Sequence, residues 1–319
     1  MKQAVLIDGV LLLDKPLGLS SNQALSRVKR LFNIQKAGHT GTLDPLATGL
    51  LPICLGEATK FAQDLLHADK TYEADIYLGK TTTTGDAEGE VLTETDVDCD
   101  LLAIQNALEK FTGRIKQIPP MYSALKKEGK PLYQYARAGQ EIARQERDVE
   151  IQELVLLQFS LPLIKIRVAC SKGTYIRTLA EDIGRYLGCG AYLSGLRRIA
   201  VGELHLSQAM TLEKLDSLSA VQRIQKLLPS DSLVQHLLAI HLTPDLAPRF
   251  LQGQRLPLGK SDNEVLNRLQ KSNACSTDYG RVIDCERGML LRVYQEERLL
   301  GLAELDNGIL RPKRLVKQI

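Results

Sequence analysis

Apolar residues recur along the chain in two spacings, and each spacing predicts a different kind of element. Intervals of three and four residues predict amphipathic helices over 21–32, 58–66, 101–111 and 176–187, with two further helical patterns between Thr211 and His241. Strict alternation of apolar and polar residues predicts half-buried strands over 72–78 and 164–170. Two apolar runs, 5–7 and 10–13, flank Asp8-Gly9, and this pattern predicts two strands joined by a turn.

The order of these patterns indicates the architecture. Hairpins and packed helices are mixed over the first part of the chain, which predicts an α+β fold. From about residue 245 the pattern changes to short strands separated by turn signals at Gly253, Gly280, Glu296-Glu297 and Asp306-Asn307-Gly308, typical of a small β-barrel-like domain. A chain of 319 residues can hold one or two domains. We therefore predict one domain over 1–240 and a second over 245–319.

Charge is unevenly distributed along the chain. The formal net charge of +3 is too small to indicate nucleic-acid binding by itself. Residues 110–147, however, hold nine basic and three acidic side chains, whereas 86–100 hold seven acidic and no basic ones. Such segregation fits a polyanion-binding face, and ordinary solvated charge runs are the alternative.

The segment 118–147 differs in composition from its surroundings. It contains Pro119-Pro120, three tyrosines and most of the basic cluster. Aromatic side chains among Lys and Arg suit a surface that grips an RNA backbone and stacks on bases. The alternative is an ordinary surface arm with extended lysine side chains.

The cysteine and histidine patterns do not indicate a metal site. The six cysteines form no CxxC pair, and the five histidines form no HExxH motif. Reduced cytosolic thiols are the simpler interpretation of these cysteines. No apolar stretch approaches the length of a membrane span, so we expect a cytoplasmic protein that does not engage a membrane.

The stretch 38–60 combines several glycines with one imidazole, His39, and, between its first three glycines, one carboxylate, Asp44. Asp44 precedes Pro45, and an aspartate before proline is a common turn initiator that needs no chemistry. No acidic residue occurs from Lys15 through Leu43, whereas five basic residues do. A lone carboxylate in positive surroundings stays ionised, which suits a nucleophile or an electrostatic stabiliser better than a general acid.

Residues 39–60, HTGTLDPLATGLLPICLGEATK, resemble the catalytic loop of the TruB-type tRNA pseudouridine synthases. The resemblance continues in GVLLLDKPLGLSSNQAL, DKTYEADIYLGKTTTTGDAEGE, PPMYSALKKEGKPLYQYAR and CSKGTYIRTLAEDIGRYLGCGAYLSGLRRIAVG, and it covers most of residues 9–210. One departure is Tyr192, which stands where relatives commonly have histidine.

The resemblance implies a fold for the whole chain. It implies the pseudouridine synthase fold, with a mixed, largely antiparallel sheet flanked by helices and an RNA-clasping insertion at about 118–147. By position and pattern, the tail is similar to the PUA domain that ends bacterial members of this family.

The resemblance also implies isomerisation of uridine to pseudouridine at position 55, in the T-arm loop of tRNA. Asp44 is then the catalytic aspartate, and Arg177 is the arginine that pairs with it. Tyr72 is the tyrosine that stacks on the uracil and serves in proton transfer. From the residues alone, Tyr72 could equally be a core residue of its strand, and Arg177 a surface arginine. The reaction needs no metal, redox carrier or nucleotide cofactor, so we expect no cofactor.

The remaining site residues follow from the same resemblance. Lys15 and Tyr175 match positions that line the pocket. His39 would fill the stack that a flipped-out nucleotide vacates, or would simply be hydrogen-bonded within its loop. We expect the T stem-loop of tRNA as the partner, a monomer, and no obligate protein partner.

Two other functions compete with this one. A tRNA-binding or folding factor would need the same positive face and the same tail. A glycosidase would need two carboxylates flanking the scissile bond, and only Asp44 stands out in the expected pocket.

Overall fold

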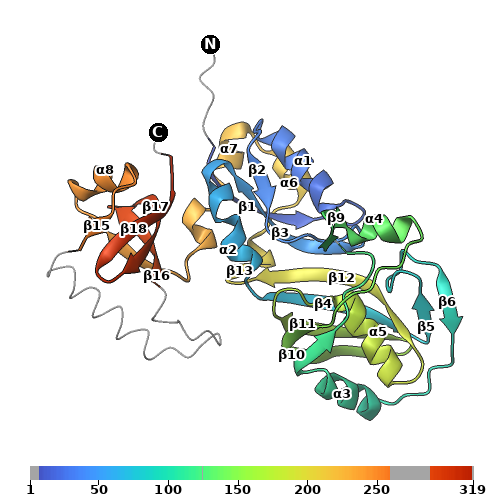
Figure 1. Cartoon of the computed structure of the whole chain (residues 1–319). Helices are drawn as coiled ribbons and strands as arrows, with labels where there is room; N and C mark the ends of the chain where they lie inside the picture. Colours follow the sequence, from blue (N-terminus) through green and yellow to red (C-terminus); the bar gives the residue numbers. More distant parts are fainter. Residues whose placement is uncertain (1–6, 124, 259–287, 318–319) are drawn as a thin grey trace. The chain divides into compact units, whose positions relative to one another are not determined.

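The computed structural model describes residues 7–123, 125–258 and 288–317 (Figure 1). Within these residues the chain forms two compact units. The larger unit holds 11–54 and 62–227, and the smaller unit holds the described parts of 1–10, 55–61 and 228–319. The domain limits 1–240 and 245–319 stay a prediction.

A nine-stranded sheet forms the centre of the larger unit, in the order β1-β3-β12-β4-β11-β10-β7, with β2 paired to β3 and β13 to β12. The strands are β1 Gly9–Lys15, β2 Ala37–His39, β3 Ala47–Leu55, β4 Lys70–Leu78, β7 Gly113–Gln117, β10 Arg147–Ser160, β11 Leu163–Cys170, β12 Ala191–Val201 and β13 Leu204–His205. The pairs β10–β11, β11–β4 and β12–β4 are antiparallel, whereas β12 and β3 are parallel. The predicted mixed, largely antiparallel sheet is therefore confirmed.

The hydrophobic core of this unit lies between the sheet and two helices, α3 (Leu101–Lys110) and α5 (Ile176–Tyr186). Alternate residues of β4 and β11, such as Ile76 and Ile166, point into it and are completely buried. The apolar stripes of the helices, including Ile104 and Ile183, meet them there. The alternation predicted for the two strands and the stripes predicted for the two helices are confirmed.

Helix α1 (Ser21–Leu31) confirms the predicted first helix and its cap. The Ser20 side chain accepts the backbone N–H of Gln23, and the Gln23 side chain accepts the backbone N–H of Ser20, so the two form a capping box. The helix predicted over 58–66 is a 3-10 helix, η1 (Gly56–Phe61), followed by α2 (Ala62–Leu66).

Two predictions near the start of the chain are wrong. Gly9 does not close a turn but begins β1, and the Asp8 carboxylate accepts the backbone N–H of Glu57 at 2.7 Å instead of capping a turn. Residues 5 and 6 of the predicted first strand lie outside the described residues.

Much of the glycine-rich stretch 38–60 is strand and not loop, because β3 inserts its apolar residues between β1 and β12. The loop that carries Asp44 is therefore only residues 40–46.

The insertion contains little regular structure. It forms a short hairpin, β8 (Lys126–Lys127) and β9 (Lys130–Pro131), followed by α4 (Leu132–Arg137). The acidic tract before α3 forms a second hairpin, β5 (Lys80–Thr82) and β6 (Val91–Glu94), around a loop of residues 83–90. Two short helices, α6 (Leu212–Ser217) and α7 (Ala220–Ile224), complete the larger unit.

The smaller unit is a curled five-stranded sheet in the order β14-β16-β17-β18-β15 (Figure 1). Its elements are η3 Ser230–Leu233, β14 Leu238–His241, α8 Leu246–Leu251, β15 Leu256–Pro257, β16 Met289–Gln295, β17 Arg298–Asp306 and β18 Ile309–Leu315. The turns predicted at Glu296-Glu297 and Asp306-Asn307-Gly308 join β16 to β17 and β17 to β18, whereas Gly280 lies outside the described residues. This sheet confirms the predicted PUA-like barrel character of the tail.

Helix α8 was not predicted, and the helical pattern up to His241 ends instead in β14, because these residues pair in parallel with β16. None of the helices described here is long and apolar enough to cross a bilayer.

Candidate active site

The loop of residues 40–46 holds Asp44 between β2 and β3, and it is fixed at both ends. The backbone N–H of Thr40 donates to the carbonyl of Pro52, and the N–H of Ala47 donates to the carbonyl of Asp44. In the middle, the Ser21 hydroxyl accepts the N–H of Leu43 at 2.7 Å and donates to its carbonyl at 2.9 Å. The first residue of α1 therefore anchors the residue next to Asp44.

Arg177 is a buried arginine that contacts four groups. Its Nη2 lies 3.0 Å from Oδ2 of Asp44 and donates to the carbonyl of Tyr122 at 2.6 Å. Its Nη1 donates to the carbonyl of Thr84 at 3.2 Å, and its Nε lies 3.5 Å from Oδ2 of Asp86. The Arg177 side chain is 7% exposed, whereas that of Asp44 is 47% exposed. A fixed guanidinium thus holds a carboxylate that still faces solvent.

Asp86 belongs to the site but was not predicted from the sequence. It is the first acid of the 86–100 run, but its side chain is only 4% exposed and lies against Arg177. Thr84 Oγ1 donates to its Oδ1 at 2.5 Å, and the backbone N–H of Glu88 donates to the same oxygen at 3.1 Å. The expectation that only Asp44 would stand out in the pocket is therefore wrong. Because Asp86 is buried behind the guanidinium, it does not supply the second exposed carboxylate of a glycosidase.

Tyr72 lies on β4 beside Arg198, a second buried arginine that the sequence did not single out. Arg198 is 1% exposed, and it donates to the carbonyl of Leu50 at 2.7 Å and to that of Gly41 at 3.1 Å. These carbonyls stand on either side of Asp44 in sequence. The guanidinium also lies beside the Tyr72 hydroxyl. Burial raises the pKa of Tyr72, and the nearby Arg198 charge opposes that increase.

Lys15 is completely buried at the end of β1. Its Nζ donates to the carbonyls of Pro16 at 2.9 Å and Leu19 at 2.6 Å. Burial lowers the pKa of Lys15 to about 8, although the charge of Asp44 works in the opposite direction. Lys15 therefore lies close enough to Asp44 to contribute positive potential there.

His39 lies at the end of β2 and is partly exposed. Its Nδ1 is buried and, among the residues that the structure describes, has no hydrogen-bond partner. Burial and then the charge of Arg198 lower the pKa of His39, so the imidazole is neutral at pH 7. The expectation that His39 is hydrogen-bonded within its own loop is therefore not met at Nδ1.

Tyr175 precedes α5 and helps to position it. Gln117 accepts the backbone N–H of Tyr175 at 3.0 Å and donates to its carbonyl at 3.3 Å. Burial raises the pKa of Tyr175, and the nearby charges of Arg147 and Arg177 oppose the increase. Since Gln117 is the last residue before the insertion, its two hydrogen bonds to Tyr175 tie the start of the insertion to the helix that carries Arg177.

The structure therefore brings the six expected site residues into one neighbourhood. Of these, Arg177 contacts Asp44 directly, whereas Lys15, Tyr72 and Tyr175 lie within reach of its charge. Tyr192, the residue that departs from the resemblance, stacks on Tyr77 at a ring-centroid distance of 5.3 Å.

Models of known protein families match residues 29–316 of the chain. Residues 29–176 match the N-terminal domain of the TruB family of pseudouridylate synthases, 177–239 the C-terminal domain of tRNA pseudouridylate synthase B, and 239–316 the C-terminal domain of pseudouridine synthase II TruB. The chain is 56% identical over 319 residues to tRNA pseudouridine synthase B of Cupriavidus metallidurans, covering 98% of this chain and 95% of that protein. It is 55% identical over 311 residues to the protein of the same name from Burkholderia pseudomallei, covering 97% of both.

Two solved structures resemble this chain over nearly its whole length. A chain of a Cbf5-Nop10-Gar1 complex is 25% identical with a TM-score of 0.67, covering 97% of this chain and 84% of that one. A chain of an H/ACA RNP bound to a substrate RNA containing 2'-deoxyuridine is 23% identical with a TM-score of 0.68, covering 97% and 85%. The second likeness is one of fold alone.

Proposed function

The chain belongs to the TruB family of pseudouridylate synthases, and from this premise we propose that it isomerises a uridine of tRNA, at position 55 in the T-arm loop, to pseudouridine. Relatives that match it over nearly their whole length are named tRNA pseudouridine synthase B, which supports tRNA as the substrate. The observation that carries the proposal is the half-exposed carboxylate of Asp44 held by the buried guanidinium of Arg177.

The reaction makes limited demands on the protein. The bond from uracil N1 to ribose C1′ breaks, the base turns, and a new bond forms from C5 to C1′. C5 loses its proton and N1 gains one, so the product is an isomer of the substrate. An ionised carboxylate can serve by adding to the base, by adding to the ribose, or by taking a sugar proton.

Asp44 supplies that carboxylate. The guanidinium of Arg177 fixes the position of Oδ2, because Arg177 is itself held by two backbone carbonyls and by Asp86. Since the rest of the Arg177 side chain is buried, the pair does not need to reorganise when the substrate enters.

Tyr72 is positioned to move the proton that C5 must lose. The positive charge of the Arg198 guanidinium lies beside the Tyr72 hydroxyl. Burial keeps the phenol protonated at neutral pH, whereas the Arg198 charge lowers the cost of transient ionisation. These two influences suit a group that relays a proton.

His39 is proposed to replace the target nucleotide in its stack. The glycosidic bond of a stacked uridine is out of reach until the nucleotide is flipped out. A neutral, partly exposed imidazole on the strand that leads into the Asp44 loop could stack in the vacated place.

The insertion is proposed to grip the RNA. Lys130 lies 4.9 Å from the ring centroid of Tyr135, and Arg137 lies 5.5 Å from that of Tyr133. Such pairs present a positive charge and an aromatic face together, as RNA-binding surfaces do. The same surface would serve a tRNA-folding factor, so binding alone does not identify the function.

The test is to incubate the wild type and Asp44→Asn with unmodified tRNA and to map pseudouridine. We expect the wild type to modify the T-loop, and the variant to bind tRNA nearly equally but form no product. Asp96→Asn, at an exposed aspartate of the 86–100 run, is the matched control and should behave as wild type. Normal product from Asp44→Asn would refute the catalytic role. Binding by the wild type without any product would favour the folding-factor function.

A further inference from the structure

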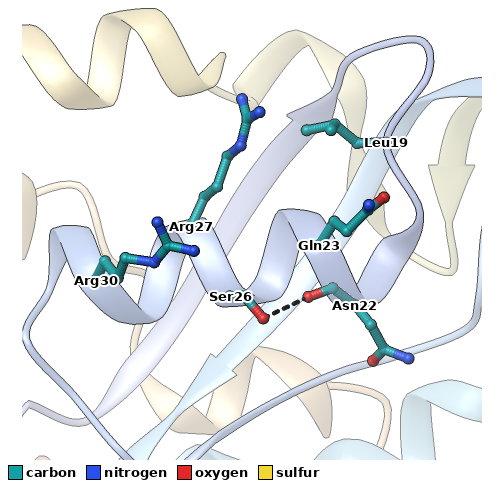
Figure 2. A pocket seen from close by; sticks show the side chains of 6 residues that line it. All are labelled: Leu19, Asn22, Gln23, Ser26, Arg27 and Arg30. Carbon is teal, nitrogen blue, oxygen red and sulfur yellow. Dashed lines mark hydrogen bonds between the residues drawn. The ribbon is translucent and has the colours of Figure 1, made fainter.

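The exposed face of α1 carries a row of hydrogen-bond donors beside a surface hollow (Figure 2). The hollow measures about 470 Å³ and is lined by Leu19, Asn22, Gln23, Ser26, Arg27 and Arg30. The last five of these residues are here called the α1 donor row. They recur at intervals of three and four residues and therefore share one side of the helix. The helix contains no acidic residue.

The α1 donor row begins beside the active site. Ser21, the first residue of the helix, is hydrogen-bonded to the backbone of Leu43, next to Asp44. At the usual rise of an α-helix, Arg27 lies about 9 Å and Arg30 about 14 Å further along the axis. The row therefore extends outward from the catalytic loop, far enough to contact several nucleotides of one strand.

The charge of Arg30 is available to a ligand, whereas that of Arg27 also acts on the carboxylate of Glu213. Among the described residues, neither Arg27 nor Arg30 lies within ion-pair distance of a carboxylate or donates a hydrogen bond. A second hollow of about 630 Å³, between α1 and α6, is bordered by the same arginines together with Glu213 and Asp216. The acidic side chains border only that second hollow, so the first hollow is lined by basic and neutral residues, including the apolar Leu19.

The chemistry of the row selects one class of ligand. Guanidinium groups match phosphate oxygens with paired hydrogen bonds, and the side-chain amides of Asn22 and Gln23 add neutral donors. The Ser26 hydroxyl already donates to the carbonyl of Asn22 at 2.8 Å. No aromatic side chain lines the hollow, so it offers no surface on which a base would stack. Donors spread along an open helix face fit a chain of phosphates better than one small anion.

We propose that the α1 donor row binds the phosphate backbone of the substrate tRNA next to the nucleotide held at Asp44. This inference rests on the proposed function, since it takes tRNA as the ligand. Contacts of this kind fix the register of an RNA on its enzyme without reading its sequence. The row would thereby help to place the target uridine over the catalytic loop.

The test compares the double variant Arg27→Gln/Arg30→Gln with the wild type. The dissociation constant for tRNA is measured at 50 and 200 mM salt, and pseudouridine formation is measured at rising tRNA concentration. The loss of two phosphate contacts should reduce the salt dependence of log Kd by about two. The affinity difference between variant and wild type should then shrink by roughly 10-fold between the two salt concentrations. Excess tRNA should restore product formation, because the defect lies in binding.

The matched control is Arg185→Gln, which removes an exposed arginine from the last turn of α5, at the opposite end from Arg177. It should leave affinity and salt dependence at wild-type values. An unchanged Kd in the double variant would overturn the inference, as would an equal loss in the Arg185 control, which would indicate a general charge effect.

The binding measurement separates this inference from the proposed function. If the wild type forms pseudouridine but the double variant binds normally, the α1 donor row is not a tRNA contact and the function stands. If the wild type forms no pseudouridine, the function fails, and the binding measurement still decides the inference. Thermal unfolding of both variants checks the fold, and surface substitutions of this kind should change stability by less than about 0.5 kcal/mol.

Discussion

Gly49 is the position where the smallest substitution should have the largest effect on the site. It lies on β3 with a φ of +98°, opposite Arg198 on the parallel strand β12. A Cβ added there would stand 2.3 Å from the carbonyl oxygen of Arg198, 2.8 Å from its nitrogen and 3.1 Å from its carbonyl carbon. All three atoms belong to the backbone and cannot move aside as a flexible side chain could.

Gly49→Ala should therefore carry two costs. Positive φ costs a residue with a Cβ about 1–2 kcal/mol. Forcing β3 and β12 apart costs a further amount of about 1–3 kcal/mol. The expected loss in the free energy of unfolding is thus about 2–5 kcal/mol. Any displacement of Arg198 also moves the carbonyls of Gly41 and Leu50 that it holds, so activity should fall along with stability.

Two other glycines separate these costs. Gly18 has a φ of +80° but open space around its added Cβ, so Gly18→Ala should lose only the backbone contribution of about 1–2 kcal/mol. Gly38 has an ordinary φ and open space, so Gly38→Ala should lie within about 0.5 kcal/mol of wild type. Urea unfolding of the three variants and a pseudouridine assay measure the order. A Gly49→Ala protein as stable as Gly18→Ala would refute the close-approach reasoning.

Three further predictions concern the charged groups of the site. Arg177→Lys replaces the planar guanidinium, which contacts both Asp44 and Asp86, by a single ammonium group that cannot contact both in the same way. The rate at saturating tRNA should therefore fall by about 100-fold or more while Kd stays near the wild-type value. An unchanged rate would contradict the need for a guanidinium at this position. Because burial lowers the pKa of Lys15 from 10.5 to about 8, the unfolded chain holds a proton that the folded chain releases between these values, and stability should rise with pH there. Urea unfolding of the wild type and of Lys15→Met at several pH values measures this effect. In that window the free energy of unfolding of the wild type should rise, relative to that of the variant, by up to about 1.4 kcal/mol per pH unit. Parallel pH profiles of the two proteins would show that Lys15 does not cause the pH dependence. His39→Ala should slow turnover of folded tRNA more than that of a loosened T stem-loop, and equal losses on the two substrates would count against its role in the vacated stack.

Elements with a local signature were predictable from the sequence. The stripes of α1 and α5 and the alternation of β4 and β11 appear in any short window, because one face of each element is buried. Strand β10 shows no such pattern, because it is exposed at most positions along its 14 residues. Its place in the sheet depends on pairing with β11 and β7, which no window of the sequence contains.

The same distinction applies to the site. Asp44 was predictable because it is the first acid after a long basic segment. Asp86 was not, because it belongs to a run of seven acids and only the fold of residues 83–90 turns this one toward Arg177. Arg198 was hidden in the same way, since its neighbour Arg197 looks identical in sequence but lies at the surface in an ion pair with Asp14. Which arginine points inward is set by the register of β12 against β3 and β4.

The balance of charge at the site also distinguishes catalysis from binding. Three cations, Lys15, Arg177 and Arg198, are buried there at 0%, 6% and 1% exposure, and burying them costs solvation free energy. Asp44 faces solvent above them, at the place where a polyanion would approach. For binding alone this exposed carboxylate is unfavourable, because it repels phosphate and offsets the attraction of the cations beneath it. A protein selected only to hold tRNA would gain affinity by replacing it with a neutral residue. The arrangement is favourable only if the carboxylate is needed for chemistry, and the buried cations then offset its repulsion of the RNA.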